Sequence, residues 1–111
     1  MKYSLKKNVI LRDKKEIQSL FMTGKWKRSP YFYMVYTPTS EGKHFLFTTQ
    51  KTIKRAFQRN RCRRILKEIV RLHQDCFPEG YNYGFIATVV PEKGSFHHYD
   101  HALKKMVERI P

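Results

Sequence analysis

The segment from Arg55 to Arg71 (RAFQRNRCRRILKEIVR) combines a strong basic charge with a helical apolar pattern. It contains seven lysines or arginines and one acidic residue. On a helical wheel drawn at about 100° per residue, the apolar positions fall in one sector and the cations point away from it. The apolar sector consists of Cys62, Ile65, Leu66, Ile69, Leu72 and Cys76. The pattern predicts a long helix over residues 54–76 that covers a sheet with one face and exposes cations on the other.

The N-terminal end of this helix is open to two interpretations. Ile53, Ala56 and Phe57 lie outside the apolar sector. Either the helix begins near Gln58, or its first turn packs against another part of the protein. Pro78 marks the other limit of the region, because proline does not continue a helix.

Strand and helix signals flank the long helix on both sides. Residues 31–36 (YFYMVY) are rich in aromatic residues, which is typical of a strand. Because residues 37–42 carry turn signals, we expect residues 44–50 to return beside that strand as a hairpin. The expected elements are, in chain order, a helix at 13–23 with Asp13 as its N-cap and Gly24 after its end, a basic loop or short edge strand at 25–28, strands at 31–36 and 44–50, the helix at 54–76, a strand at 83–90 and a last helix capped by Ser95.

This α-β-β-α-β-α order predicts an α/β sandwich, that is, an α+β fold with a mixed sheet and three helices packed on it. The connection through the long helix is long enough to pair the second and third strands in parallel. With 111 residues and no linker or repeat, the chain is expected to form one domain, residues 1–111. Because it has no apolar run of spanning length and no signal-peptide pattern, we expect a cytoplasmic protein. Cys62 and Cys76, placed on one helix about 21 Å apart, are expected to be two buried free thiols.

The formal net charge of +14 points to a polyanionic partner. The charged residues of the long helix are almost all positive, so ion pairs along the helix do not account for them. An anionic membrane surface is the second candidate, but the apolar face of the helix is needed to cover the sheet. Arginine binds phosphate bidentately, and aromatic rings on a sheet stack on unpaired bases. These features favour structured or single-stranded RNA as the partner.

The sequence contains no group of residues that predicts a self-sufficient active site. Its nine acidic residues form no spaced cluster suited to two-metal phosphodiester chemistry, and there is no glycine-rich phosphate loop. His97 and His101 have helical spacing, but a metal site needs further ligands. We therefore assign no catalytic residue and no metal ligand.

Residues 50–68 (QKTIKRAFQRNRCRRILKE) closely resemble the signature of the protein subunit of bacterial ribonuclease P. The matching positions are Lys51, Ala56, Arg59, Asn60, Arg61, Arg63 and Arg64. Further positions that resemble the family are Leu11, Ile17, Phe21 and Gly24 around the first helix, and Tyr83, Phe85, Ile86 and Ala87 in the last strand. The motif departs from the family pattern where Thr52 replaces its second lysine and Lys54 its glycine, with Arg55 following.

The resemblance implies both a fold and a role. The fold is the family's sandwich with a left-handed βαβ crossover. The protein is then the subunit of an endoribonuclease that forms the mature 5′ end of tRNA, with the catalytic centre and its Mg²⁺ in the RNA subunit. Its partners are the catalytic RNA and the single-stranded 5′ leader of precursor tRNA, in a 1:1 ribonucleoprotein with a monomeric protein and no membrane contact.

The resemblance also implies two binding surfaces. The surface for the catalytic RNA comprises Lys51, Lys54, Arg55, Arg59, Asn60, Arg61, Arg63, Arg64 and Lys67. The leader-binding cleft beside the first helix comprises Ile17, Phe21, Tyr31, Tyr33 and Tyr36. A shift of one residue in the register of that strand moves its side chains to the other face.

An alternative function belongs to another class of protein. A structural ribosomal protein or RNA chaperone without a role in cleavage has the same composition and charge. Only the motif at residues 50–68 favours the ribonuclease P role over this alternative. A stand-alone nuclease would require cleavage by the protein without RNA, which we do not expect.

Overall fold

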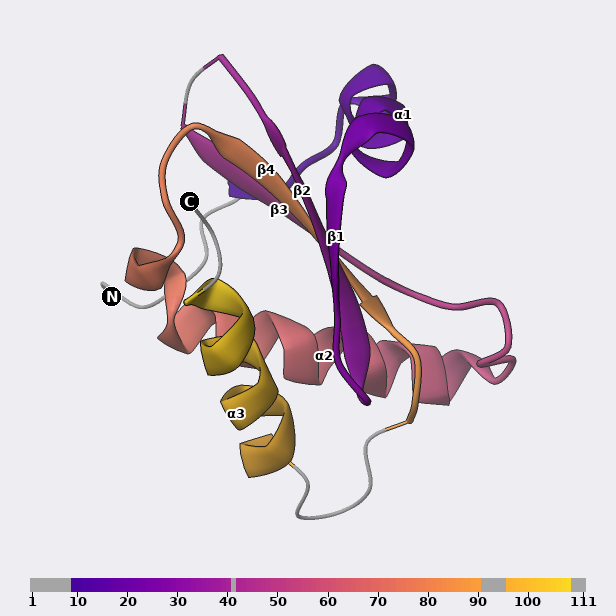
Figure 1. Cartoon of the computed structure of the whole chain (residues 1–111). Helices are drawn as coiled ribbons and strands as arrows, with labels where there is room; N and C mark the ends of the chain where they lie inside the picture. Colours follow the sequence, from indigo (N-terminus) through magenta and orange to yellow (C-terminus); the bar gives the residue numbers. More distant parts are fainter. Residues whose placement is uncertain (1–8, 41, 91–95, 109–111) are drawn as a thin grey trace.

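The computed structural model of the chain describes residues 9–40, 42–90 and 96–108. A four-stranded sheet forms its middle layer, α1 lies on one face of the sheet, and α2 and α3 lie on the other (Figure 1). The elements in chain order are α1 (Lys14–Thr23), β1 (Lys25–Arg28), β2 (Phe32–Pro38), β3 (Lys43–Thr49), α2 (Ala56–Leu72), the 3-10 helix η2 (Gln74–Cys76), β4 (Tyr81–Ala87) and α3 (Phe96–Val107). This architecture confirms the predicted α+β sandwich with a mixed sheet. In the described part of the chain, no helix combines the length and the apolar character needed to cross a membrane.

The strand order in the sheet is β1-β2-β4-β3. β4 pairs in parallel with β3, so the predicted parallel pairing across the long helix is confirmed. The predicted hairpin between residues 31–36 and 44–50 is wrong, because β4 lies between these two strands and pairs antiparallel with β2. Every residue of β4 from Asn82 to Ala87 is buried. A strand that is covered on both faces belongs in the centre of a sheet, which explains why β4 separates β2 from β3.

β2 forms its hairpin with the short basic strand β1 instead. Ser29 closes the turn between them. Its main-chain N–H donates to the main-chain oxygen of Phe32 at 3.1 Å, and the N–H of Phe32 donates to Ser29 Oγ at 3.1 Å. For residues 25–28 the sequence allowed either a loop or an edge strand, and the structure shows an edge strand.

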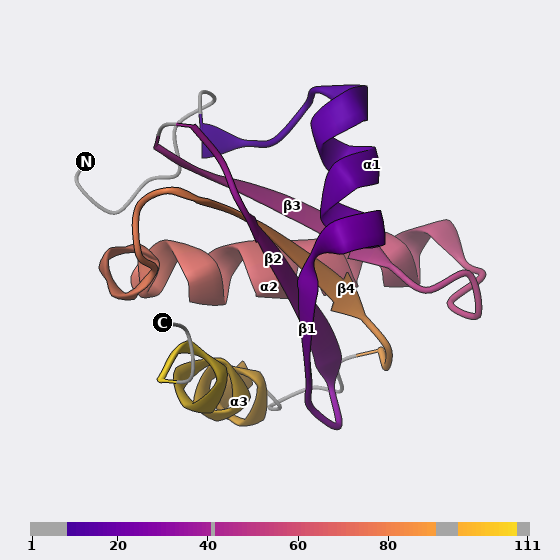
Figure 2. The ribbon, with the colours of Figure 1, turned by 45° about the horizontal axis from the view of Figure 1, so that its top comes forward.

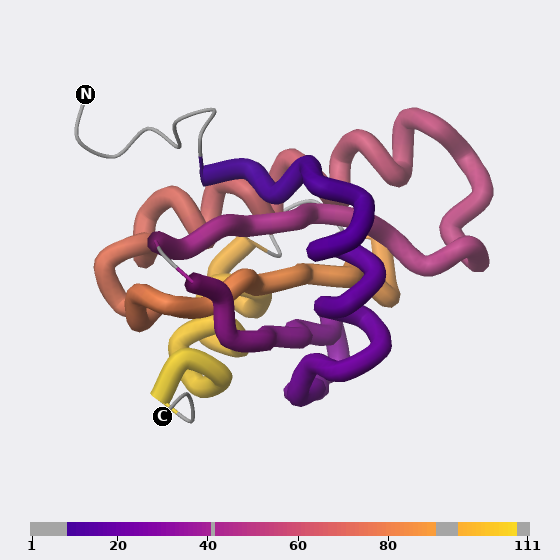
Figure 3. The backbone as a smooth tube through the Cα atoms, turned by 90° about the horizontal axis from the view of Figure 1, so that it is seen from above, coloured from indigo at the N-terminus to yellow at the C-terminus, as the bar shows by residue number. Residues whose placement is uncertain are grey.

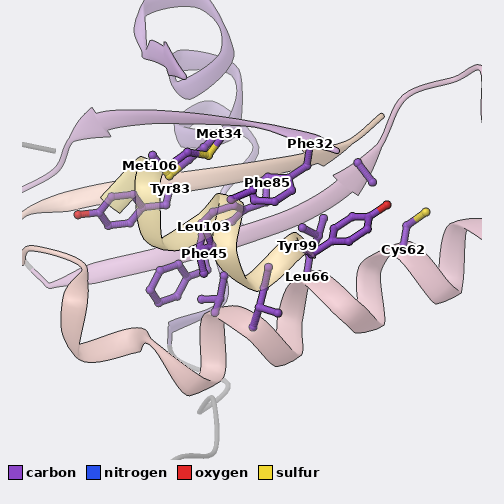
Figure 4. Close-up of a cluster of buried hydrophobic side chains, with 14 of the residues drawn as sticks. Phe32, Met34, Phe45, Cys62, Leu66, Tyr83, Phe85, Tyr99, Leu103 and Met106 are labelled. Carbon is purple, nitrogen blue, oxygen red and sulfur yellow. The ribbon is translucent and has the colours of Figure 1, made fainter. Parts of the chain in front are cut away.

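The larger core lies between the sheet and the helices α2 and α3 (Figure 4). Cys62, Leu66 and Ile69 of α2 are fully buried there, as the apolar sector predicts. Leu72 of the same sector is 43% exposed, and Val70, which the predicted sector does not include, is buried. Aromatic rings of the sheet meet them, and Phe45 and Tyr83 stack with ring centroids 5.6 Å apart. Burying one large apolar side chain contributes about 1.5–3 kcal/mol, so this layer holds α2 firmly on the sheet.

α2 is shorter than the predicted helix at both ends. It begins at Ala56 and ends at Leu72, and η2 follows after a break at His73. The Nε2 atom of His73 contacts Oδ1 of Asp100 in α3 at 2.6 Å, which ties the two helices together. Cys76 lies in η2 and is exposed, whereas Cys62 is buried. The expectation of two buried thiols on one helix is therefore wrong.

α1 packs on the opposite face of the sheet (Figure 2) through a smaller cluster of buried residues. The cluster consists of Leu11, Leu20, Val35 and Ile86. The segment before α1 runs beside β3 (Figure 3), where the N–H of Leu11 donates to the main-chain oxygen of Phe45 at 2.8 Å. Asp13 then caps α1 as predicted, because its carboxylate accepts a hydrogen bond from the N–H of Lys15 at 2.9 Å.

Gly24 ends α1, but not through a left-handed turn, because its φ is −70°. A Cβ atom at this position would lie 2.4 Å from the main-chain oxygen of Leu20 and 2.5 Å from Cγ2 of Val35. Glycine is needed here because the end of α1 approaches β2 too closely for a side chain. This close approach fixes where α1 lies on the sheet.

Candidate nucleic-acid interface

The exposed side of α2 forms a depression next to β3, which we call the basic hollow. Its polar residues recur at i, i+3, i+4 and i+7, so they share one face of the helix. These residues are Asn60, Arg63, Arg64 and Lys67. Ile10, Leu46 and Phe47 complete the lining of a volume of 440 Å³. The structure thus brings together four of the residues that the sequence assigns to RNA binding.

Two side-chain contacts organise the charge of the basic hollow. Nη2 of Arg63 donates to Oδ1 of Asn60 at 2.7 Å, which fixes the direction of that arginine. Nε of Arg71 donates to Oε2 of Glu68 at 2.9 Å, and this hydrogen bond lowers the pKa of Glu68. The one acid of α2 is thus paired with Arg71 and does not neutralise the cations of the hollow.

Arg59 holds the start of α2 instead of lining the basic hollow. Its Nη1 atom donates to the main-chain oxygen of Ile53 at 3.3 Å and also to that of Lys54. Ile53 is buried in the larger core. The first arginine of the Arg-Asn-Arg motif therefore joins the helix to the loop that precedes it.

The helix start resolves the two sequence interpretations. α2 begins at Ala56, so a start near Gln58 is wrong. Ile53 is buried just before the helix, but Phe57 is 65% exposed, so only part of this region packs against the rest of the protein. Lys54, which replaces the glycine of the family pattern, needs no unusual backbone, because no described non-glycine residue has a positive φ.

The remaining cations assigned to the catalytic RNA lie outside the basic hollow. Lys51, Lys54 and Arg55 are exposed in the loop before α2, and Arg61 is exposed on the helix. They enlarge the positive surface at the N-terminal end of α2, where the helix dipole also favours anions.

A second depression, the aromatic groove, crosses the sheet on the side of α1. Its floor is one row of the strand register, in which Arg28 pairs with Tyr33, Tyr33 with Ile86, and Ile86 with Thr48. Phe21, Trp26, Thr49 and Gln50 complete the lining of a volume of 490 Å³. Because neighbouring strands lie about 4.8 Å apart, the row spans about 14 Å across all four strands.

The aromatic groove combines rings with a cation. The rings of Phe21 and Trp26 have centroids 6.0 Å apart, and Trp26 is 42% exposed. Cζ of Arg28 lies 5.6 Å from the centroid of the Tyr33 ring. None of the described residues that line the groove is acidic. Proteins that bind single strands combine stacking rings and cations in this way.

The structure divides the five residues predicted for the leader-binding cleft. Phe21 and Tyr33 line the aromatic groove, and Ile17 packs half-buried beside it against the smaller core cluster. Tyr31 and Tyr36 do not line the aromatic groove. Tyr36 is 4% exposed in the core on the opposite face, and Tyr31 packs on Tyr99 of α3 with centroids 5.0 Å apart.

The physical reason for this division is the alternation of side chains along a strand. Tyr36 lies an odd number of residues after Tyr33, so the two point to opposite faces. Tyr31 precedes Phe32, the first residue of β2, and lies in the turn, where the alternation does not apply.

Sequence reasoning missed most of the groove. The missed residues are Trp26, Arg28, Thr48, Thr49, Gln50 and Ile86. Trp26 and Arg28 alternate with lysines in the KWKR segment, which is a strand signal with one aromatic face. This signal predicts the groove only if β4 is known to lie between β2 and β3. Only that strand order places one residue from each of the four strands in the same row.

Comparisons with known proteins give one consistent result. Residues 5–111 match the family model described as Ribonuclease P. The chain is 32% identical over 100 residues to the ribonuclease P protein component of a Nitratiruptor species, covering 90% of each chain. It is 33% identical over 107 residues to that of Borrelia hermsii, covering 94% of this chain and 93% of the relative.

Two solved structures share the fold. The RNase P protein from Thermotoga maritima superposes with a TM-score of 0.76 at 20% identity, covering 92% of this chain and 97% of that one. The RNase P protein of Staphylococcus aureus superposes with a TM-score of 0.75 at 13% identity, covering 90% and 93%.

Proposed function

The chain belongs to the bacterial ribonuclease P protein family, and we propose that it binds both the catalytic RNA of ribonuclease P and the single-stranded 5′ leader of precursor tRNA. In this role it assists the RNA-catalysed removal of the leader, which produces the mature 5′ end of the tRNA. The observation that carries the proposal is the presence of two different RNA-type surfaces, the basic hollow and the aromatic groove, in one member of this family.

The basic hollow supports binding to the catalytic RNA. Arg63, Arg64 and Lys67 converge there with Asn60, and no described lining residue is acidic. Arginine forks match phosphate geometry, and each phosphate that is neutralised releases counterions. A folded RNA with closely spaced phosphates satisfies such a cluster better than an isolated anion does.

The aromatic groove supports binding to the leader. Its rings lie on the floor and wall of a depression in the sheet. Bases that are free of pairing stack on such rings, which is how many proteins hold single strands. Thr49 and Gln50 at one end of the groove lead directly into residues 51–55 and α2. A leader in the groove therefore lies close to the protein's contacts with the catalytic RNA.

The chemistry of cleavage is assigned to the RNA with its Mg²⁺. The described residues contain no group of three or more His, Cys, Asp or Glu side chains that would fit a metal ion. We derive no step through a metal held by the protein. A monomeric protein in a 1:1 cytoplasmic ribonucleoprotein completes the proposal.

Reconstitution tests this function. The protein is added to the catalytic RNA at low Mg²⁺, and formation of the mature tRNA 5′ end is measured at limiting protein. Stimulation is expected for the native protein and for Lys14→Ala/Lys15→Ala, two exposed lysines of α1 outside both surfaces. Strongly reduced stimulation is expected for Arg63→Ala/Arg64→Ala. Absence of stimulation by the native protein would contradict the proposal and favour an RNA-binding role without cleavage.

A further inference from the structure

A third depression lies between the β1–β2 turn and α3, and we call it the α3 pocket. Both ribbon views show α3 passing beside this turn (Figures 1 and 2). The pocket has a volume of 320 Å³. The basic and aromatic residues of its lining are Lys27, Arg28, Tyr31, His98, His101 and Lys105. Tyr31 is the one member of this cluster that the resemblance to the family assigns to RNA binding, and none of its members lines the basic hollow.

The cations of the α3 pocket have no opposing charge in the described part of the chain. Lys27 and Lys105 form no ion pair there, and none of the described lining residues is acidic. Asp100, the acid of α3, is occupied by Lys104 at 3.4 Å and by His73 at 2.6 Å. Glu108, just after the helix, does not line the pocket. Like charges gathered around one hollow repel each other unless an anion enters it.

The pocket also offers a stacking surface. The rings of Tyr31 and His98 are nearly parallel, with an interplanar angle of 4° and centroids 6.1 Å apart. Tyr31 is braced from behind by Tyr99, which is 1% exposed. An aromatic platform beside phosphate-binding cations is the combination that single-strand binders use for a base and its phosphate.

Arg28 connects the α3 pocket with the aromatic groove, because it lines both. The floor row of the groove ends at Arg28 on β1, which is the edge strand. Side chains alternate along β1, so Lys27 points to the other face, the face of α3. An RNA strand that crosses the sheet from β3 to β1 therefore meets Lys27 as soon as it passes the β1 edge of the sheet.

We propose that the α3 pocket binds a nucleotide of the same RNA strand that lies in the aromatic groove. Lys27, Arg28 and Lys105 hold its phosphate, and its base lies against Tyr31 and His98. The inference rests on the proposed binding of the leader and extends it around the edge of the sheet. Continuity through Arg28 favours a single continuous strand over a separate anion.

The test uses labelled single-stranded RNAs of increasing length and measures their affinity for the full-length protein by fluorescence anisotropy. The native protein is expected to gain affinity in a step once the strand is long enough to pass Arg28. Lys105→Ala is expected to weaken binding of the long strands about three- to tenfold and to reduce the slope of log affinity against log salt by about 1. It leaves the short strands unaffected. His98→Ala removes the same step through the loss of stacking.

Lys104→Ala is the control on the same helix, because it removes one positive charge from a lysine that contacts Asp100 and does not line the α3 pocket. Equal losses for Lys105→Ala and Lys104→Ala at every strand length would overturn the inference. The inference is also overturned if Lys105→Ala weakens binding of the catalytic RNA, measured without any leader strand, by the same factor. In that case the α3 pocket binds a phosphate of the catalytic RNA.

Failure of the leader-binding proposal is distinguishable from failure of this inference. In that case the short strands fail to bind the native protein, or Phe21→Ala in the groove leaves their affinity unchanged. If only the α3 pocket is misassigned, the short strands bind normally and added length brings no gain.

Discussion

Arg59 is joined to Ile53 by a hydrogen bond from its Nη1 atom to the main-chain oxygen of Ile53 at 3.3 Å, across six residues of chain. Ile53 is 6% exposed and belongs to the larger core. Arg61, two positions further along the same motif, is exposed. The two arginines of the Arg-Asn-Arg motif therefore have different structural surroundings. We expect Arg59 to stabilise the start of α2 and Arg61 to bind RNA.

Arg59→Ala is expected to lower the free energy of unfolding by about 1 kcal/mol, because the carbonyl groups before α2 lose their charged donor. Arg61→Ala is expected to change it by less than about 0.5 kcal/mol, as is usual for an exposed side chain. Arg61→Ala instead weakens binding to the catalytic RNA. Urea denaturation and RNA titration of both variants measure the two effects.

Arg59→Lys is the control for this comparison, because it keeps the charge but loses the planar fork. Equal unfolding free energies for Arg59→Ala and Arg61→Ala would show that the contact with Ile53 does not stabilise the start of α2.

Gly24→Ala is expected to destabilise the protein by about 1–3 kcal/mol, the usual cost of overpacking. The new Cβ would lie 2.5 Å from Cγ2 of Val35, so α1 has to move away from β2. The aromatic groove contains Phe21 of α1, and single-stranded RNA binding is therefore expected to weaken in the same variant. Thermal denaturation and RNA titration measure the two effects. Gln18→Ala, at an exposed position of the same helix, is expected to change neither.

Tyr33→Ala and Tyr36→Ala are expected to have opposite effects. Tyr33 lies on the floor of the aromatic groove, so its loss is expected to cost about 1–3 kcal/mol of single-stranded RNA binding. Tyr36 is 4% exposed in the core, so its loss is expected to cost about 3–5 kcal/mol of stability. RNA affinity is measured under conditions where each variant is folded, as judged by circular dichroism. A loss of RNA affinity in folded Tyr36→Ala that matches the loss in Tyr33→Ala would contradict the assignment of faces.

The two faces of α2 were predictable because buried and exposed residues of a helix alternate with a short period along the chain. Cys62, Leu66 and Ile69 are buried, and Arg64 and Lys67 are not, as the wheel predicts. The same holds for the cap of α1, since an N-cap depends on residues that are neighbours in the chain. Motif and helix together therefore predicted the four polar residues of the basic hollow, but not Ile10, Leu46 and Phe47.

The aromatic groove was not predictable in the same way, because it depends on which strands become neighbours. The turn at residues 37–42 favours a hairpin locally, but burial of β4 on both faces places it between β2 and β3. Only this order brings Arg28 and Thr48 into one row. The role of Gly24 was likewise hidden, because a close approach between α1 and β2 leaves no local pattern.

The two cysteines are expected to react with a thiol reagent at very different rates. Cys76 is exposed in η2, whereas Cys62 is 0% exposed and its Sγ lies 3.8 Å from the main-chain oxygen of Val89. Burial also raises the pKa of the Cys62 thiol. The reactive thiolate therefore forms only at higher pH than for an ordinary cysteine.

With dithionitrobenzoate in native buffer, one thiol is expected to react rapidly and the second only as the protein unfolds. The absorbance of the released thiol gives both rates. Cys76→Ser is expected to abolish the fast phase and leave the slow phase, and adding urea accelerates the slow phase along the unfolding curve. Two fast phases in the folded native protein would mean that Cys62 does not pack between α2 and the sheet, and that the apolar sector of the basic helix does not form the core.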